Sequence, residues 1–447
     1  MLPAHSVRTS IAVSAAGLTV IAALLLHPAR SQCPEAPIAQ SEVGLSARLV
    51  SGKIIAGEQD LVVTIRAPED SVQARPPLSV AVVIDRSGSM SGEPLTNAKA
   101  AADRLVDSLG DNDAFTIVTY SSTDEVVTGI ARATSDAKAR AHDEIEKIWA
   151  HGNTCISCGI NRGASELVKT PVVGGLQRMV LISDGQANDG IYDRDELAQL
   201  AANTAAHGVS ISAVGVGLDF DEITMMRLAR VGHGNYYFVE NTATLRDMFA
   251  QELGGLTRTV AADLRLDIRE APGTRVVDAY GYPLLREGES ITVPVADLRA
   301  GEVRKVVLRV AVNGSEGIAQ VAHLDLGWRR VADGAHRNSE AVVSTTIVRD
   351  AAEALRSTDR ATLEEAEAAH SARVVEQAAR VYETQGAAAA EAVMDQHMTE
   401  LDKNGLLGAG AKAKLQATEG QIRMDFAQKP AAAATKSARA EAYKLAQ

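Results

Sequence analysis

Three nearly uninterrupted apolar runs dominate the middle of the sequence: LSVAVVID from Leu78, QRMVLIS from Gln177 and VSISAVGVG from Val209. An apolar run that lacks alternation is expected for a strand buried on both faces of a sheet. Segments with helical periodicity separate these runs, for example residues 94–110 and 193–208. Strands that alternate with helices at this spacing predict an α/β fold. We expect a doubly wound, mostly parallel (Rossmann-like) sheet with helices on both faces.

A second pattern begins near Thr259, where strand-like segments follow one another without helices. Several of them alternate apolar and polar residues, so the segment 257–349 is expected to form a β-sandwich with solvated outer faces. Two further strand-like segments lie within residues 42–77. An isolated hairpin is only marginally stable, so these strands need partners. We therefore expect residues 42–77 to complete the sandwich, with the α/β domain, 78–256, inserted in it rather than simply followed by it.

The end of the chain is rich in alanine, with 28 alanines in the last 97 residues. Because alanine has the highest helix propensity, this composition predicts an α-helical region over residues 350–427. The last segment, 428–447, carries four basic residues and one acidic residue. Its composition predicts a disordered tail.

The beginning of the chain has the features of a targeting segment. Arg8 precedes an uncharged run of 16 residues from Ile11 to Leu26, and small residues follow at Ala29 and Ser31. This order predicts a signal peptide, residues 1–31, that is cleaved after Ser31. The mature protein would then be secreted or periplasmic. The alternative is a membrane anchor formed by residues 11–26, although a spanning helix needs roughly 20 residues.

The charge of the chain excludes some classes of partner. The formal net charge is −12, and the chain after Ser31 carries −14. A chain with this negative charge is a poor binding partner for nucleic acid. It is also a poor partner for an anionic membrane surface, unless the N-terminal segment is retained as an anchor. Aromatic residues make up only 3 % of the sequence, which argues against a base-stacking surface and against aromatic anchors in an interface.

Polar side chains follow two of the apolar runs. Asp85, Ser87 and Ser89 come directly after the first run and directly before a predicted helix. Asp184 ends the second run, and Thr154 lies in a loop that leads into another helix. Ligands of doubly wound sheets bind at the carboxyl ends of the strands, so we expect these oxygen donors to meet at one edge.

A simpler interpretation is that Asp85 caps the first helix and that Ser87 and Ser89 only form a turn. That interpretation leaves Thr154 and Asp184 unexplained. The combination of the D-x-S-x-S motif, the threonine and the second aspartate resembles the von Willebrand factor A domain with its metal-ion-dependent adhesion site. The resemblance extends from about Leu78 to Leu256, and all five motif positions match. The surrounding organisation is similar to that of secreted bacterial proteins with this domain.

The resemblance implies a binding protein rather than an enzyme. It implies that Ser87, Ser89 and Thr154 contact a divalent cation, and that Asp85 and Asp184 act largely through water. Donor sets made only of oxygen suit Mg²⁺, or Ca²⁺ or Mn²⁺. An open position on the ion would accept a carboxylate from a protein ligand, as in adhesion or assembly. None of these loops carries an obvious general base.

The motif region also contains a C-x-x-C pair, Cys155 and Cys158, directly after Thr154. Three interpretations remain open: a local disulfide that stiffens the loop, two free buried thiols, or a redox-active pair. Zinc is excluded by the lack of a second Cys or His pair with ligand spacing. Two alternative functions therefore accompany metal-dependent binding. One is a thiol–disulfide redox protein using Cys155 and Cys158, and the other is a scaffold subunit without metal-dependent binding.

Overall fold

The structure is a computed structural model. It describes residues 42–69, 76–169, 172, 175–184, 186–216, 221–239, 258–288 and 290–445. The predicted signal peptide, 1–31, and the last part of the predicted α/β domain, 240–256, lie outside these residues.

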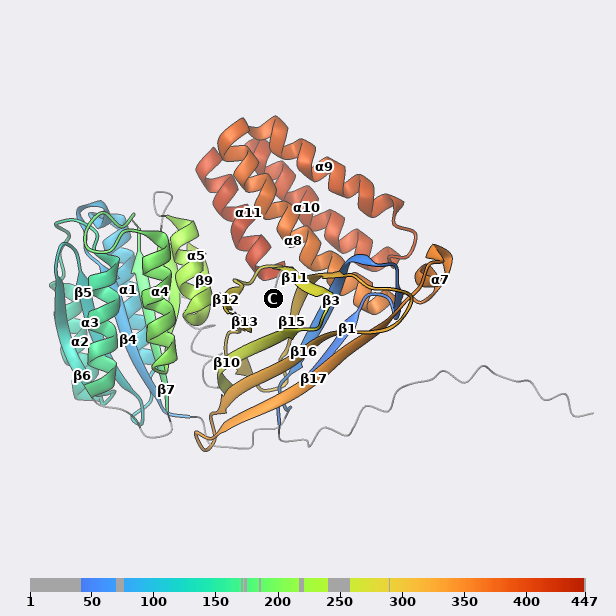
Figure 1. The fold of residues 1–447 in the computed structure, drawn as a ribbon. Helices are drawn as coiled ribbons and strands as arrows, with labels where there is room; N and C mark the ends of the chain where they lie inside the picture. Colours follow the sequence, from blue (N-terminus) through green and yellow to red (C-terminus); the bar gives the residue numbers. More distant parts are fainter. Residues whose placement is uncertain are drawn as a thin grey trace, which may run out of the picture. The chain divides into compact units, whose positions relative to one another are not determined.

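A six-stranded sheet forms the first part of the fold (Figure 1). Its strand order is β6-β5-β4-β7-β8-β9, and all neighbours are parallel except β5 and β6. The predicted mostly parallel sheet is therefore confirmed. The strands are β4 (Leu78–Asp85), β5 (Ala114–Tyr120), β6 (Asp124–Arg132), β7 (Leu176–Ser183), β8 (Val209–Val216) and β9 (His233–Val239).

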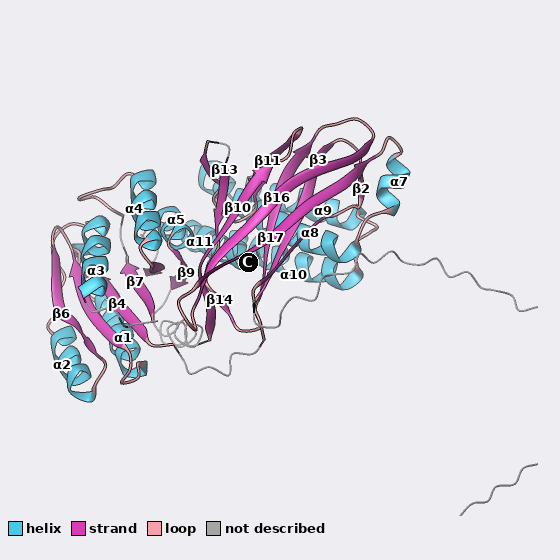
Figure 2. Cartoon of the chain, turned by 60° about the horizontal axis from the view of Figure 1, so that its bottom comes forward, coloured by secondary structure: helices cyan, strands magenta, loops and turns pink. Residues whose placement is uncertain are grey.

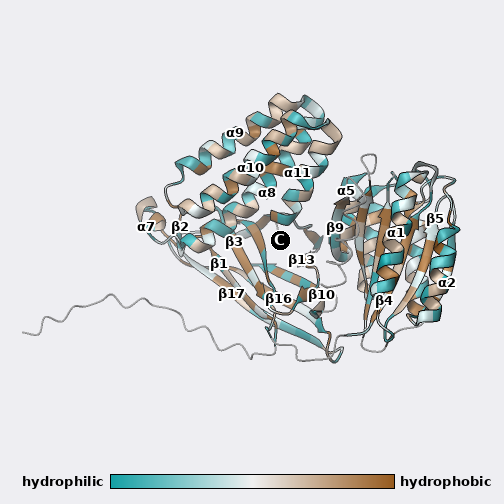
Figure 3. Ribbon diagram, turned by 180° about the vertical axis from the view of Figure 1, so that it is seen from behind, coloured by the Kyte–Doolittle hydropathy of each residue, from teal (hydrophilic) through white to brown (hydrophobic). Residues whose placement is uncertain are grey.

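Helices cover both faces of this sheet (Figure 2). Alternate residues of β4 point to opposite sides: Val80 and Val82 pack with α1 and α2, whereas Ala81 and Val83 pack with α3, α4 and α5. Both faces of β4 are thus buried, which explains its unbroken apolar sequence (Figure 3). The helices are α1 (Glu93–Ser108), α2 (Ser135–Glu146), α3 (Ile156–Lys169), α4 (Arg194–Ala206) and α5 (Glu222–Val231).

Two further sheets, antiparallel but for one short strand, pack into a β-sandwich around a shared apolar core. The N-terminal strand β3 pairs with β15 along its whole length, from Gly57 opposite Val312 to Arg66 opposite Val303. Strands from before and after the α/β domain therefore lie in one sheet, as predicted for an insertion. The four-stranded sheet contains β1 (Gly44–Leu49), β3 (Gly57–Arg66), β15 (Val303–Val312) and β11 (Thr274–Ala279). The seven-stranded sheet contains β12 (Leu285–Glu287), β13 (Ser290–Pro294), β10 (Thr259–Glu270), β16 (Gly317–Arg330), β17 (His336–Ile347), β2 (Lys53–Ile54) and β14 (Leu298–Arg299).

The C-terminal part is helical, as predicted for residues 350–427. Its second helix, α8, places Ala366 and Ala369 against Val62 and Val307, on the face of the four-stranded sheet that points away from the sandwich core. None of the helices in the described ranges is long and apolar enough to cross a membrane. The helices are α7 (Ala351–Arg356), α8 (Arg360–Gln385), α9 (Ala387–Lys403), α10 (Ala409–Gln428) and α11 (Ala431–Leu445).

The predicted disordered tail, 428–447, is wrong for most of its length. Residues 431–445 form α11, and Arg439 and Tyr443 are buried. Arg439 pairs with Glu222 at the start of α5, and the Tyr443 hydroxyl donates a hydrogen bond to the backbone oxygen of Gly234. Composition alone missed this because it does not show that two of the basic residues, Lys436 and Arg439, pair with the buried Glu222.

Candidate functional site

The first site loop begins where β4 ends. Asp85 is the last residue of that strand and is fully buried. The backbone N–H of Ser87 donates to Asp85 Oδ1 over 2.8 Å, which turns the chain back on itself. A single 3₁₀ turn, Gly88–Met90, then leads into α1. This geometry fixes the two serine hydroxyls beside the end of the strand.

The loop that carries Asp184 follows β7 and contacts the first loop. Ser89 Oγ donates to Asp184 Oδ1 over 3.0 Å, and Ser87 Oγ lies 3.1 Å from Ser89 Oγ. Ser183 Oγ donates to Asp85 Oδ2 over 2.7 Å, so the end of β7 also supports the motif carboxylate. Asp85, Ser87, Ser89 and Asp184 therefore lie in one connected network, although almost one hundred residues separate its two halves.

Thr154 lies at the same edge of the sheet, in the loop that precedes α3. The N–H of Gly88 donates to the backbone oxygen of Gly152 over 3.0 Å, which ties this loop to the first one. The N–H of Thr154 donates to Asn188 Oδ1 over 2.7 Å, and the N–H of Asn188 returns a bond to the Thr154 oxygen over 3.1 Å. Thr154 is thus held between the other two loops, and its backbone makes these contacts.

Most of the site is buried, and Ser89 is exposed. Burial raises the pKa of the Asp85 carboxyl above its ordinary 3.8, and hydrogen bonds from Ser87 and Ser183 partly offset that effect. Asp184 and Thr154 are also buried, whereas Ser89 is exposed. Solvent therefore reaches the site at Ser89, beside the carboxylate of Asp184.

Sequence reasoning missed the residues that position this site. Ser183 supports Asp85, Asn188 orients Thr154, and Gly152 joins two loops. A serine beside a predicted strand-end aspartate is a weak signal that could have suggested the first. The other two depend on which loops meet in space, which no spacing in the sequence reveals.

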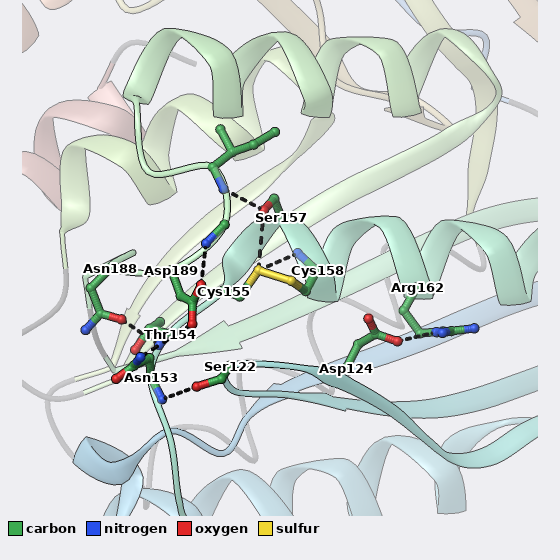
Figure 4. Close-up of a disulfide and its surroundings, with 12 residues drawn as sticks. Ser122, Asp124, Asn153, Thr154, Cys155, Ser157, Cys158, Arg162, Asn188 and Asp189 are labelled. Carbon is green, nitrogen blue, oxygen red and sulfur yellow. Dashed lines mark hydrogen bonds and ion pairs between the residues drawn. A yellow bond between two sulfur atoms is a disulfide. The ribbon is translucent and has the colours of Figure 1, made fainter.

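Cys155 and Cys158 form a disulfide directly beside Thr154, with Cα atoms 5.3 Å apart (Figure 4). The structure therefore contains the first of the three forms considered for this pair. The N–H of Cys155 donates to the backbone oxygen of Ser121, at the end of β5, over 2.9 Å. The disulfide thus lies between the loop that carries Thr154 and the start of α3.

Two exposed aromatic side chains lie on the loops of the site. Trp149 is 63 % exposed and stacks on His151, three residues before Thr154, with ring centroids 3.9 Å apart. Tyr192 is 71 % exposed and follows the Asp184 loop. Within the described ranges, the other aromatic side chains are buried or partly buried. The low aromatic content of the chain therefore does not prevent two exposed aromatic side chains from lying on these loops.

Comparisons with known proteins agree with this architecture. The family model of the von Willebrand factor type A domain matches residues 79–251. The protein YfbK of Escherichia coli (strain K12) is 27 % identical over 265 residues, which cover 57 % of this chain and 45 % of YfbK. The protein sll0103 of Synechocystis is 25 % identical over 216 residues, which cover 48 % of this chain and 50 % of that protein. The chain thus spans about half the length of the curated relatives that it matches.

Two solved structures share the fold over most of the chain. A von Willebrand factor type A protein from Catenulispora acidiphila aligns with a TM-score of 0.69 at 16 % identity, covering 90 % of this chain and 96 % of that one. The ArnB paralog VWA2 from Sulfolobus acidocaldarius aligns with a TM-score of 0.60 at 15 % identity, covering 91 % and 99 %. The similarity therefore includes regions outside the six-stranded sheet. The chain therefore contains a von Willebrand factor type A domain over residues 79–251, is related in sequence to YfbK, and shares its fold with bacterial structures of this domain.

Proposed function

We propose that this protein binds a divalent cation at the loop edge of its A domain and uses the ion to bind a partner protein through an acidic side chain. The observation that carries the proposal is the network joining Ser87, Ser89 and Asp184, next to the buried carboxylate of Asp85. The hydroxyls of Ser87, Ser89 and Thr154, with the carboxylates of Asp85 and Asp184, would hold Mg²⁺, Ca²⁺ or Mn²⁺.

The donor set fits such an ion. It consists of hydroxyl and carboxylate oxygens, the ligands preferred by hard cations. In the described part of the chain, no group of three or more His, Cys, Asp and Glu residues is placed to hold a metal. If the hydroxyls of Ser87, Ser89 and Thr154 contact the ion directly and the two carboxylates act through water, the ion would have only neutral side chains as direct protein ligands. The cation would supply a positive charge that attracts an acidic ligand.

A protein ligand fits the surroundings of the site. Exposed Trp149 and Tyr192 flank the loops, and such side chains often contribute strongly to protein interfaces. The chain as a whole is acidic, so it would repel an acidic partner at long range. We therefore infer a local, ion-dependent attachment, which moderate salt would strengthen slightly by screening that repulsion.

The proposal extends to location and to reaction class. A signal peptide ending at Ser31 would export the protein to the periplasm or the cell exterior, and a disulfide such as Cys155–Cys158 is typical of an oxidising compartment. We propose a binding role rather than an enzymatic one.

Partner capture tests the proposal. Immobilised full-length protein would be incubated with an envelope fraction of its source cells, in Mg²⁺ or in EDTA. Asp184→Asn removes one carboxylate from the site with little change in size. Ser91→Ala is the matched control, because Ser91 is an exposed serine just beyond the motif. We expect partners that wild type and Ser91→Ala retain only in Mg²⁺ and that Asp184→Asn loses. Identical capture in all conditions would refute metal-dependent binding.

A further inference from the structure

The Cys155–Cys158 disulfide touches both loops that carry the later site residues. The backbone of Gly190, in the loop after Asp184, packs against the sulfur: a Cβ atom added there would lie 2.4 Å from Cys155 Sγ. Beside it, the N–H of Ile191 donates to Ser157 Oγ over 3.0 Å. The disulfide and its neighbouring serine therefore form the surface on which the Asp184 loop rests (Figure 4).

The same loop also depends on Thr154, the residue that precedes the disulfide. The backbone oxygen of Thr154 accepts hydrogen bonds from the N–H groups of Asn188 and Asp189, over 3.1 and 3.3 Å. Asn153 Nδ2 adds a contact to Asp189 Oδ2 over 3.4 Å. A change in the backbone at Cys155 would reach Thr154 directly and the Asp184 loop through these contacts.

The two sulfur atoms differ in a way that favours exchange at one of them. Cys155 is fully buried, whereas Cys158 is partly exposed. Cys155 Sγ accepts the N–H of Cys158 over 3.3 Å and lies 3.5 Å from the Ser157 hydroxyl, so this sulfur is enclosed by the fold. A reductant that approaches from solvent therefore reaches Cys158 Sγ, and Cys155 is the leaving group.

We propose that Cys158 is a thiol-exchange site and that reduction of this disulfide by a dithiol weakens the cation site. One thiolate of the reductant attacks Cys158 Sγ, forms a mixed disulfide and releases the Cys155 thiolate, which takes up a proton. The second thiol of the reductant, as its thiolate, then attacks the reductant's own sulfur in the mixed disulfide and releases Cys158, which is protonated in turn. Two electrons pass from the dithiol to the protein, and the reductant leaves as a disulfide.

Reduction separates two sulfur atoms that are bonded in the oxidised protein. The freed thiols need more space, and Gly190 lies against one of them. We expect the Asp184 loop to move off the start of α3, carrying Asp184 away from Ser89. The link to cation affinity rests on the proposed function, whereas the loosening of the loop does not.

The test uses full-length protein with Cys33→Ser, so that Cys155 and Cys158 are the remaining cysteines. It is treated with dithiothreitol or left oxidised, and thiol labelling without denaturant measures reduction. Amide hydrogen exchange over residues 186–193 then reports the loop without reference to any metal. Titration with Mn²⁺ reports the site. We expect labelling of both thiols, faster exchange in the loop and about tenfold weaker Mn²⁺ binding, the size seen for groups that support metal ligands.

Two glycine variants control for indirect effects. Gly190→Ala places a methyl group against Cys155 Sγ and should weaken Mn²⁺ binding even in the oxidised protein. Gly208→Ala is matched to it, because Gly208 also has a positive φ, +84° against +64°, but has open space around it. We expect its Mn²⁺ affinity to equal that of the parent protein.

The outcomes separate this inference from the proposed function. A pair that dithiothreitol fails to reduce in the native protein would overturn the inference. So would a reduced protein with unchanged loop exchange and unchanged affinity. If the oxidised protein binds no Mn²⁺, the proposed function fails, and the exchange data still decide whether reduction releases the loop.

Discussion

The residues of the site have two roles. Some would face a ligand, and others hold those residues in place. Ser89 is exposed and donates to Asp184, whereas Asp85 is fully buried and accepts from Ser87 and Ser183. A buried carboxylate is stable only when hydrogen bonds or charges compensate for lost water. The structure thus gives Asp85 two donors within the fold, and leaves Ser89 exposed to solvent.

Gly159 gives a test of packing close to the site. It lies in α3, where an added Cβ would be 2.6 Å from a ring carbon of Tyr120 and 2.9 Å from Val83. We predict that Gly159→Ala lowers the free energy of unfolding by roughly 1–3 kcal/mol, as overpacking does. Gly420→Ala, in α10, meets open space and should instead stabilise by about 0.5–1 kcal/mol through helix propensity. Chemical denaturation measures both, and equal effects would contradict the close contact of α3 with the sheet.

The site was predictable from the sequence only in part. Asp85, Ser87, Ser89 and Asp184 could be placed at one edge because each follows an apolar strand and carboxyl ends of parallel strands share an edge. Asn188 and Gly190 could not be foreseen, because their roles come from contacts between loops that are distant in the chain. The pairing of the two cysteines also remained open until their positions were known.

At the scale of elements, a histidine links α1 and α2. His142 of α2 lies between Asp103 and Asp107 of α1, at 2.6 and 2.9 Å. Partial burial lowers the pKa of His142, but hydrogen bonds and charges from the two aspartates outweigh burial, so its pKa is raised above 6.5. When it is protonated, the ring pairs with both aspartates and holds the two helices together.

This pairing predicts a pH-dependent stability. Because the folded pKa is raised, the contribution of His142 is complete below its unfolded pKa, near 6.5, and is lost as the pH rises through the folded value. His142→Gln should lower the free energy of unfolding at pH 5.5 by roughly 0.5–1 kcal/mol, a value suited to partly exposed ion pairs. At pH 9 the variant should resemble wild type. Denaturation at both pH values checks this, and a loss that is larger at pH 9 would refute the pairing.

The elements of the fold were largely predictable because they follow simple patterns. Unbroken apolar runs such as that in β4 indicated strands buried on both faces, and alternation indicated the sandwich strands. The pairing of β3 with β15 was inferred because isolated strands lack partners, and the structure confirms it. The helix formed by residues 431–445 was not predicted, because the alanine and lysine content of a segment does not show that Arg439 pairs with Glu222.

At the scale of the whole molecule, α11 connects the end of the chain to the A domain. Arg439 contacts Glu222 over 2.5 Å and Glu383 over 2.7 Å, and Glu222 is nearly fully buried. Tyr443 also packs edge-on against Tyr236 of β9, with ring centroids 6.0 Å apart. The last helix therefore contacts both α5 and β9, rather than trailing in solvent.

Removing the Arg439 charge tests this connection. Arg439→Met keeps the length of the side chain but removes the closer of the two cations that pair with Glu222 in the described residues, and Lys436 remains at 3.7 Å. We predict a loss of about 3 kcal/mol in the free energy of unfolding, the lower end for breaking a buried pair. Lys444→Met is the control, since Lys444 is exposed and pairs with Glu441 of the same helix. If both variants match wild type in thermal unfolding, α11 does not dock as described.

The central claim, that the loop edge of the A domain holds a divalent cation, is tested most directly by titrating the full-length oxidised protein with Mn²⁺. Wild type is compared with Ser89→Ala and with the matched control Ser91→Ala. We predict a single site in wild type, unchanged affinity in Ser91→Ala, and an affinity at least about tenfold weaker in Ser89→Ala, as expected for loss of a ligand or its support. Absence of binding in wild type, or equal affinities in the two serine variants, would contradict the claim.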